Sequence, residues 1–569
     1  MTRMDVTADL VVVGGGLGGC SAAIAAADAG LRVVLTEETD RVGGQITSQL
    51  VAALDEHATV EQFPGSASYA ALRAAIRAQY GGAQNPGGGW VSRLCFEPAV
   101  GQRILEGWLA ERGVSVLTGI RPVSAETCAG HVTAVRFDDD TRAAGRVFAD
   151  ATELGDLLPL TGAPWVIGSE GPLYKESLAL PEEDPHAVQS CTWCAVIEYV
   201  PGARFEPVPS PPNYARWRDG YRFDIAGWDG TRHSYRMFTD GPDGRPPFWT
   251  YRRLATSPDL ALLNWVSNDY ADASLVHEPL RARRESREQT LGFIHWLQTE
   301  APHDDDLGRG FRSLRLRPDV AGTLDGLAAA PYVRESRRLR TASPVTEHDL
   351  TPRPGRARAR AFNDSVGVAH YHADLHPRVG VPETQYATTA PFQVPLRALV
   401  SDRPNNLVMA AKNLGATQVA GAAYRVHSGE WIIGEAAGVL ASVATGRSAS
   451  PARALDDEAF RRSLQRALVR RGVALSWTID IDQSDGIFCA SQLLVAAGAL
   501  AGARLERLDV HPDAPVDDRD RQAMHRAALR VSASRVISAP IHSRRDTWRA
   551  LVHHYADQLG IPHEGKSHP

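Results

Sequence analysis

The feature that most constrains this chain is a glycine-rich turn within its first twenty residues. An apolar run, Leu10 to Val13, leads into Gly14-Gly15-Gly16-Leu17-Gly18-Gly19, and the Ala-rich stretch from Ser21 to Ala29 precedes a second apolar run that ends at Glu37. This order predicts a strand, a tight turn, a helix and a second parallel strand. The sequence therefore predicts a dinucleotide-binding βαβ unit at the start of an α/β domain.

Each glycine of the turn has a separate role in this prediction. Gly14 lets the chain turn sharply out of the strand, Gly16 lets the backbone approach a pyrophosphate, and Gly19 brings helix and strand close together. The free N–H groups and the positive dipole at the helix start would hold the phosphates. Glu37 stands about 20 residues further on, where an acidic side chain accepts hydrogen bonds from a ribose. A dinucleotide is the predicted ligand.

Three further segments resemble the FAD-binding elements of the glutathione-reductase structural superfamily. Arg41-Val42-Gly43-Gly44-Gln45 resembles the R-x-G-G segment that follows the first βαβ unit. Residues 149–156 resemble the strand end that closes the FAD domain, although Glu153-Leu154 separate the threonine from the glycine. A late strand at 406–413 and a helix containing Gly434-Glu435-Ala436-Ala437-Gly438 resemble the elements that complete the domain. In that superfamily, the helix N-terminus points at the flavin.

Several longer sequence segments, spread over about residues 5–445, resemble the sequences of a bacterial group known as FAD-dependent oxidoreductases. They are Glu37-Glu38-Thr39-Asp40, residues 43–49, residues 92–98, residues 332–338 and Lys412-Asn413-Leu414-Gly415. The group is distantly similar to fumarate-reductase-type and thiazole-biosynthesis flavoproteins. The resemblance implies FAD as the cofactor, but no one substrate. With the glycine turn, it implies these cofactor-binding residues: Gly14, Gly16, Gly19, Glu37, Glu38, Gly43, Gly44, Gln45, Asp156, Asn413 and Glu435.

The length of 569 residues predicts more than one domain. If the late elements belong to the FAD domain, residues 1–160 and 386–448 form a discontinuous Rossmann-like domain. Residues 161–385, which hold seven of the twelve tryptophans, would be an inserted mixed-sheet substrate domain. Amphipathic helical patterns in residues 449–569 predict a helical accessory domain, for which packing or homo-oligomerisation is the default role.

Composition narrows the possible partners and the location. The net charge of −6 argues against nucleic acid as a main partner. No apolar run reaches about 18 residues and no secretion signal is apparent, so we expect no membrane span and a cytoplasmic protein. Six cysteines in so long a chain do not make a disulfide scaffold. The His370/His372 pair lacks a third ligand in sequence, so no metal site is expected.

Candidate catalytic residues occur just before the chain returns to the FAD domain. Two histidines flank a tyrosine in His370-Tyr371-His372, and on a strand both imidazoles would share one face. They could supply a general base and an anchor for a substrate oxygen, and a structural pair of hydrogen-bonded histidines is the alternative. Arg334 and Arg337 could clamp a substrate carboxylate, and an ion-pair network is the alternative. Arg425 and its neighbours could also reach the flavin ring, but they rank below His370 as candidate catalytic residues.

These elements together predict an FAD-dependent oxidoreductase that takes a hydride from a small polar, possibly anionic, substrate onto flavin N5. In this hypothesis, His370 or His372 accepts the proton, and Arg334 or Arg337 orients the substrate. No second glycine fingerprint for NAD(P)H occurs in the sequence. Two alternatives stay open, a flavin-dependent monooxygenase that uses external NAD(P)H and a non-catalytic flavin-binding scaffold.

Overall fold

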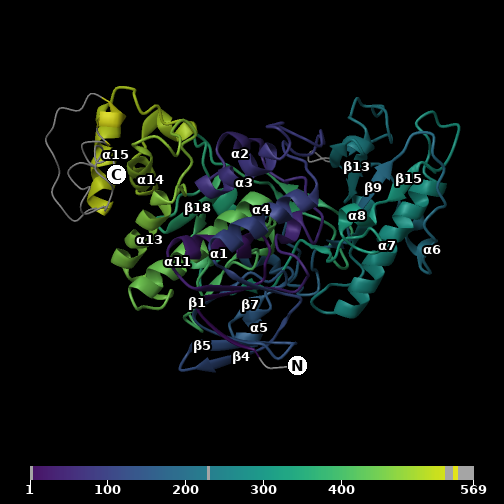
Figure 1. The fold of residues 1–569 in the computed structure, drawn as a ribbon. Coiled ribbons are helices and arrows are strands. Elements are labelled where there is room, and N and C mark those ends of the chain that lie inside the picture. Colours follow the sequence, from purple (N-terminus) through teal and green to yellow (C-terminus); the bar gives the residue numbers. More distant parts are fainter. Residues whose placement is uncertain (1–3, 227–230, 532–542, 547, 549–569) are drawn as a thin grey trace.

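The chain forms three regions that lie side by side in the computed structural model (Figure 1). The structure describes residues 4–226, 231–531, 543–546 and 548. The central region holds the N-terminal βαβ unit, with the middle of the sequence on one side and the C-terminal helices on the other. Of the predicted accessory domain, residues 532–542, 547 and 549–569 lie outside the described residues.

A seven-stranded sheet forms the centre, in the order β3-β2-β1-β6-β5-β4, and β22 also pairs with β6. Strands β3, β2, β1, β6 and β22 pair in parallel, whereas β4 and β5 form an antiparallel extension. The strands are β1 (Asp5–Val13), β2 (Val33–Glu37), β3 (Ser115–Thr118), β4 (Pro122–Cys128), β5 (His131–Phe137), β6 (Arg142–Asp150) and β22 (Leu407–Met409). Because parallel strands end at one edge, β1, β2, β6 and β22 deliver their following loops to the same place.

The strand β22 brings a late part of the chain into the N-terminal sheet. Its three residues pair with the second half of β6, from Phe148 to Asp150, whereas β5 pairs with the first half of β6. This placement matches a discontinuous FAD-binding region, and the α/β fold class expected from the sequence is confirmed. The residue boundaries of the three domains remain predictions.

Two long helices, α1 (Leu17–Asp28) and α11 (His427–Gly446), cross in close contact over the sheet. The helices approach this closely because glycines stand at the contact. A Cβ atom on Gly434 would lie 1.9 Å from the carbonyl oxygen of Gly18. A Cβ on Gly438 would lie 2.2 Å from the carbonyl oxygen of Ala22. The close approach places the start of α11 beside the glycine turn. Further helices around this region are α2 (Ala58–Gln62), α3 (Ala67–Ala78), α4 (Pro98–Glu111), α5 (Leu157–Thr161) and α10 (Gln418–Tyr424).

The middle of the sequence folds into small sheets in which every pairing is antiparallel. A four-stranded sheet has the order β12-β13-β9-β15 and a three-stranded sheet the order β14-β8-β16. The strands are β8 (Cys191–Thr192), β9 (Ala195–Tyr199), β12 (Arg253–Thr256), β13 (Asp259–Leu263), β14 (Asp269–Tyr270), β15 (Leu314–Leu316) and β16 (Tyr332–Val333). The long helix α7 (Pro279–Thr299) packs beside them.

Two antiparallel strand pairs link the middle region back to the centre. They are β18 (Ser365–Ala369) with β21 (Phe392–Pro395), and β19 (Ala373–Leu375) with β20 (Gln385–Ala387). The C-terminal region then adds α12 (Arg453–Asp456), α13 (Glu458–Arg470), α14 (Phe488–Ala496) and α15 (Asp518–Val531). Trp477 from this region is buried, and its indole N–H donates to the carbonyl oxygen of Phe392 at 3.1 Å. No helix among the described residues is long and apolar enough to cross a bilayer.

Candidate functional site

The glycine turn leaves β1 in a conformation that requires glycine. Gly14 has a φ of 103°, and a Cβ there would lie 2.2 Å from the carbonyl oxygen of Ala151 at the end of β6. A Cβ on Gly19 would lie 1.9 Å from the carbonyl oxygen of Gly14, so helix and strand approach as the spacing predicts. Gly16 has an ordinary φ of −64°. The turn therefore places the start of α1 directly above the ends of β1 and β6.

A cavity of about 290 Å³ opens beside this turn, and we call it the Gly14 cavity. The carboxylate of Glu37 lies at its edge and accepts hydrogen bonds from the N–H of Gly15 at 2.8 Å and from the N–H of Thr39 at 2.9 Å. Burial raises the pKa of Glu37 to about 7. The cavity-lining residues include four sequence-predicted cofactor ligands, Gly14, Glu37, Glu38 and Asp156.

Arg337 also lines the Gly14 cavity, where its guanidinium pairs with the carboxylate of Asp156 at 2.9 Å. The sequence suggested this arginine as a clamp for the substrate. The structure places it in the Gly14 cavity and away from the larger cavity described below, because the backbone of residues 337–338 runs beside the loop that follows β6. We therefore do not assign Arg337 to substrate binding.

A second glycine segment packs against the first. The N–H of Gly43 donates to the carbonyl oxygen of Gly15 at 2.7 Å, and a Cβ on Gly44 would lie 2.8 Å from the Cα of Gly16. Behind them, the amide of Gln45 donates to the carbonyl oxygen of Arg425 at 3.0 Å. These contacts bring four of the predicted cofactor residues, Gly16, Gly43, Gly44 and Gln45, to the N-terminal end of α1.

Two carboxylates and one lysine lie at the same helix end. The N–H of Gly18 donates to Glu430 Oε1 at 3.4 Å, and the amide of Gln45 donates to the other oxygen of Glu430. Lys412 pairs with Glu153 and lies 3.8 Å from the Glu430 carboxylate. Burial raises the pKa of Glu430, and the ammonium of Lys412 partly offsets that rise. An anion-binding helix terminus is thus occupied by a side chain of the protein itself.

The residues around the glycine turn, which we call the glycine cradle, fit a polar cofactor. Gln45 Oε1, Gln49 Oε1 and Ser428 Oγ are buried and have no hydrogen-bond partner among the described residues. Buried polar atoms in folded proteins almost always have partners, so three such atoms around one cradle indicate a missing polar ligand. A dinucleotide that extends from the Gly14 cavity toward the start of α11 would supply them. The residues present therefore fit FAD.

Two residues predicted to bind the cofactor have other contacts. The amide of Asn413 donates to the carbonyl oxygen of Asp150 at 3.0 Å and ties the loop after β22 to β6. Glu435 pairs with Arg471 at 2.8 Å and accepts from the hydroxyl of Ser68 at 2.7 Å. Glu435 lies two turns into α11 and lines neither the Gly14 cavity nor the cavity described next.

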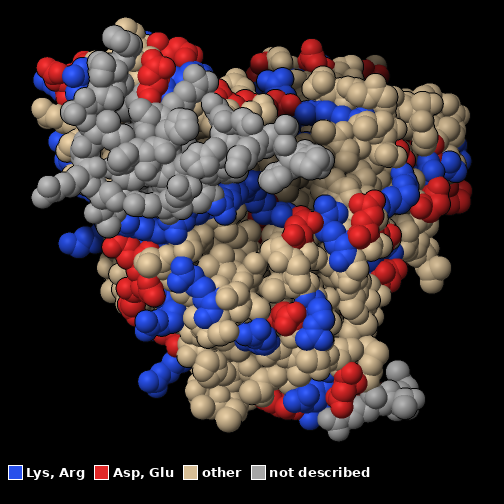
Figure 2. All heavy atoms as spheres, turned by 60° about the vertical axis from the view of Figure 1, so that its left-hand side comes forward, with Lys and Arg blue, Asp and Glu red and all other residues tan. Residues whose placement is uncertain are grey.

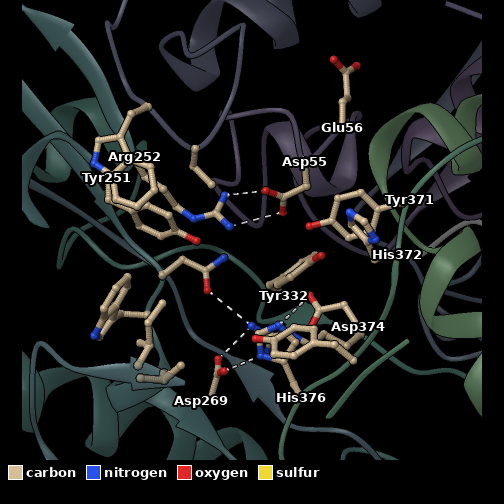
Figure 3. Close-up of a pocket in the computed structure, with 18 of the residues that line it drawn as sticks. Asp55, Glu56, Tyr251, Arg252, Asp269, Tyr332, Tyr371, His372, Asp374 and His376 are labelled. Atoms are coloured by element: carbon tan, nitrogen blue, oxygen red, sulfur yellow. Dashed lines mark hydrogen bonds and ion pairs between the residues drawn. The ribbon is translucent and has the colours of Figure 1, made fainter. Parts of the chain in front are cut away.

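A larger cavity of about 480 Å³ lies between the central region and the middle sheets (Figure 3). We call it the aromatic cavity because seven aromatic side chains line it: Trp90, Tyr235, Tyr251, Trp265, Tyr332, Tyr371 and Tyr386. Its volume is within the usual range for small-molecule sites. The cavity is joined to the glycine cradle by Arg425, whose side chain lines the cavity and whose carbonyl oxygen contacts Gln45.

Three arginines of this cavity are each paired with a buried aspartate. Arg252 pairs with Asp55 at 3.0 Å, and Arg334 with Asp269 at 2.8 Å. Arg425 pairs with the third aspartate, Asp374, at 3.3 Å. Although burial opposes it, the facing cations hold the pKa of Asp374 down at about 2 and those of the other two aspartates below their ordinary values. The three carboxylates thus balance the three guanidinium charges.

A histidine connects two of these pairs. His376 Nδ1 lies 2.6 Å from Asp269, and its Nε2 lies 3.2 Å from Asp374, as Figure 3 shows for the three labelled side chains. Arg425 then reaches the hydroxyl of Tyr332 at 2.8 Å. These contacts form a continuous polar surface from Arg334 to Tyr332, which we call the cavity floor.

The predicted histidine pair is not on a strand. Residues 370–372 lie between β18 and β19, so the expectation of two imidazoles on one strand face is wrong. His372 lines the aromatic cavity, whereas His370 points behind it and contacts the Thr59 hydroxyl through Nδ1 at 2.8 Å. The ring of His57 lies against that of His370, with centroids 3.7 Å apart and the planes tilted by 34°. Burial lowers the pKa of His370 to about 3, that of His57 to about 4, and that of His372 below its ordinary value.

Several residues of the cavity floor were missed by sequence reasoning, namely Asp55, Arg252, Asp269, Asp374 and His376. They come from four separate places in the chain, and each by itself is an ordinary polar residue. One weak signal was present, because His372, Asp374 and His376 alternate at every second position. Metal ligation does not explain them, since no group of three potential ligands among the described residues could hold a metal ion.

Comparison with known proteins identifies the family. The sequence profile of the family described as FAD dependent oxidoreductase matches residues 9–468. The chain belongs to this family. It is therefore an FAD-dependent oxidoreductase, and FAD is its cofactor. No curated protein is similar enough in sequence to count as a match.

Three solved structures that are similar to this FAD-dependent oxidoreductase match only parts of it. L-amino acid deaminase from Proteus vulgaris is 16% identical, with 35% of this chain and 56% of that chain covered and a TM-score of 0.24. T. acidophilum thioredoxin reductase is 17% identical, with 25% and 34% covered and a TM-score of 0.16. Thermovibrio ammonificans THI4 is 15% identical, with 29% and 66% covered and a TM-score of 0.20. The chain thus spans less than two thirds of each, and the family assignment rests on the sequence profile.

Proposed function

We propose that this FAD-dependent oxidoreductase oxidises a small, polar and uncharged organic substrate in the aromatic cavity, at a CH–OH or CH–NH position. The observation that carries this proposal is the position of Arg425, whose side chain lines the cavity while its backbone contacts Gln45 of the cofactor cradle. A second link supports it, since the N–H of Asp55 donates to His427 at the start of α11. A substrate in this cavity would lie beside the cofactor.

The charge balance of the cavity favours an uncharged substrate over an anionic one. Arg334 was a candidate carboxylate clamp in the sequence, but its guanidinium already donates to Asp269 and to the Thr192 hydroxyl, both at 2.8 Å. Arg252 and Arg425 are likewise paired with aspartates. An anion held by one of these three arginines would have to break its buried pair, which costs several kcal/mol. Hydroxyl or amine groups can instead add hydrogen bonds to the existing polar floor.

His372 is the residue that we propose as proton acceptor. FAD bound in the cradle would supply the two-electron acceptor. Burial lowers the pKa of His372, so its imidazole is neutral at pH 7 and can take a proton from a substrate hydroxyl or amine. His370, the other candidate, does not line the cavity and makes hydrogen-bond contacts with Thr59 and the carbonyl oxygen of Thr389. We assign it a supporting role behind His372.

An anaerobic reduction screen tests the function. The FAD-loaded protein is mixed with alcohols, polyols, amines and hydroxy acids, and loss of the flavin absorbance identifies a donor. We expect an uncharged hydroxylated or amino compound to reduce the flavin. Reduction by carboxylates alone would refute the assignment of an uncharged substrate, and reduction by none, with turnover only when NAD(P)H is added, would favour the monooxygenase alternative.

Two matched variants test the proton acceptor. His372→Gln should lower kcat with the best donor about 100-fold or more, since general base catalysis contributes on this order. His370→Gln should have a smaller effect and serves as the control in the same segment. With the wild type, kcat/KM should rise through a pKa below 6.5 and stay level toward pH 8. Equal turnover by the wild type and His372→Gln would remove His372 from this role.

We further propose that the protein works in the reducing cytoplasm. All six cysteines are free, and four of them are buried. Oxidising compartments favour paired cysteines, so the pattern supports this location. Fractionation of the native cells followed by detection of the protein would test it, and recovery outside the cytoplasmic fraction would refute it.

A further inference from the structure

A second set of cavities lies where the C-terminal helices meet the central region. A cavity of about 410 Å³ is lined by residues 340–343, 396–397 and 400–402 and by the beginning of α13. A cavity of about 480 Å³ extends to the end of α14. The two share Ser343, Asn363 and Arg397, so they adjoin, and we call them together the arginine groove. The groove has no lining residue in common with the aromatic cavity or the Gly14 cavity.

The groove carries an excess of positive charge. Five arginines and three aspartates line it, and two arginines are neutralised: Arg360 pairs with Asp349 at 3.0 Å, and Arg397 with Asp364 at 2.8 Å. Arg340, Arg461 and Arg530 have no carboxylate within ion-pair distance in the part of the chain that the structure describes. The third aspartate, Asp402, is exposed at the rim. In a protein with a net charge of −6, this local excess calls for an explanation.

Hydroxyl groups without partners provide a second and independent observation. The side chain of Ser401 is only 1% exposed, lines the groove and has an Oγ with no hydrogen-bond partner among the described residues. The hydroxyl of Thr341, in the same cavity, is also buried and unpartnered within the described ranges. A buried hydroxyl normally finds a partner, and a ligand anion that enters the groove would accept a hydrogen bond from it.

Two of the arginines are held in position before any ligand arrives. Arg461 Nη1 donates to the carbonyl oxygens of Ala454 and Leu455 at 3.2 and 3.0 Å, at the end of α12. The guanidinium of Arg397 lies over the ring of Phe362, 4.4 Å from its centre. Preorganised guanidinium groups lose little freedom on binding, so they suit an anion that accepts several hydrogen bonds at once. Lys and Arg side chains also gather along the face that carries the C-terminal helices (Figure 2).

We propose that the arginine groove binds a phosphate-bearing small molecule. The phosphate lies between the unpaired Arg340 and Arg461 and accepts a hydrogen bond from the Ser401 hydroxyl. Phosphate oxygens match guanidinium N–H groups in charge and in geometry, whereas a carboxylate would offer fewer acceptor atoms. The apolar side chains of Leu396, Val400 and Leu455 form the rest of this wall and contact the uncharged part of the ligand.

Calorimetric titration of the FAD-loaded protein with inorganic pyrophosphate tests the site. Loading with FAD keeps the probe out of the cofactor cradle. The wild type should bind one pyrophosphate per chain, with an affinity that falls as salt is added. Arg461→Gln and Arg340→Gln should each weaken binding about tenfold, because each removes a charge-assisted hydrogen-bond donor. Ser401→Ala should weaken it less, by about threefold.

Arg462→Gln is the matched control. Arg462 is the neighbour of Arg461 on α13, pairs with Glu458 at 2.6 Å and does not line the groove, so this variant should bind pyrophosphate as the wild type does. Thermal unfolding of every variant shows that it is folded, and Arg340, an exposed side chain, allows the test even if Arg461→Gln is unstable. Equal affinity in wild type, Arg461→Gln and Arg340→Gln would overturn the proposal. So would binding of an acidic peptide without binding of pyrophosphate, which would indicate a protein partner instead.

Discussion

The carboxylate of Glu430 at the N-terminus of α1 gives the sharpest prediction for cofactor binding. Glu430 Oε1 accepts from the N–H of Gly18, at the helix end where the pyrophosphate of a dinucleotide normally binds. An anionic cofactor must therefore bind beside this carboxylate or take its place. Replacing Glu430 by Gln removes the negative charge and keeps the shape and an oxygen that can still accept from Gly18.

The expected change in the Kd for FAD on replacing Glu430 follows from the charges that face its carboxylate. Two unit charges 4 Å apart repel by about 4 kcal/mol at an effective dielectric constant of about 20. Lys412 lies 3.8 Å from the carboxylate and offsets part of this repulsion, while Glu153, which Lys412 also contacts, adds to it. We expect about a third of the full value to remain, about 1.4 kcal/mol, which corresponds to a tenfold tighter Kd for FAD at pH 8.

The pKa of Glu430 determines how the affinity for FAD should change with pH. Burial raises the pKa of Glu430 above its ordinary value, so the wild-type side chain takes up a proton at a higher pH than an exposed glutamate does. Wild-type affinity for FAD should therefore rise at lower pH, whereas Glu430→Gln has no charge to lose at this position and should change less. The tenfold difference at pH 8 should shrink as the pH is lowered. Quenching of flavin fluorescence during titration of the apoprotein measures both Kd values without turnover.

Glu435→Gln is the control for this experiment. Glu435 is also a buried carboxylate on α11, but it pairs with Arg471 and lies away from the end of α1. Its replacement should leave the FAD affinity within about twofold of the wild type, in contrast to what the sequence suggested for this residue. Weaker FAD binding by Glu430→Gln at pH 8, or the same pH slope as the wild type, would refute the reasoning.

Three further predictions concern stability. Asp269→Asn leaves Arg334 buried without a counter-charge, so the free energy of unfolding in urea should fall by about 3 kcal/mol; a loss below 1 kcal/mol would contradict the pairing. Gly14→Ala places a Cβ 2.2 Å from Ala151 O at a φ of 103°, so flavin content and Tm should both drop. Burial raises the pKa of Glu176 to about 7, so the wild type loses stability as pH rises from about 4.5 through 7. Glu176→Gln should be more stable by about 1–2 kcal/mol at pH 8 and nearly equal at pH 5 in urea unfolding, and equal stability at both pH values would refute this.

The cofactor domain could be predicted from sequence because its constraints are local. Gly14 must adopt a positive φ, and Glu37 must end a strand a fixed distance later, so both leave a pattern in a few dozen residues. The late strand β22 was also recognisable from its apolar run. What local patterns could not show is the occupation of the helix end by Glu430, since Gly18 and Glu430 stand 412 residues apart in sequence.

The aromatic cavity, by contrast, could not be predicted from local sequence patterns. Arg334 drew attention because it stands in a charged motif, but its role depends on Asp269, 65 residues away, and on His376 beyond it. A clamp for a substrate anion and a partner in a buried ion pair require the same residue type in the same local pattern. Only the fold, which supplies or withholds the neighbouring carboxylate, distinguishes the two roles.

The same reasoning applies to the C-terminal region, which the sequence marks off as an accessory segment. Trp477 from this region packs edge-on against His370, with ring centroids 6.0 Å apart, and against Phe63 at 5.3 Å. His370 in turn contacts the ring of His57, which lines the aromatic cavity. Because burial is what lowers the pKa values of these histidines, a tryptophan that covers them from behind helps to keep them neutral. The C-terminal region is thereby tied to the chemistry of the cavity and not only to packing.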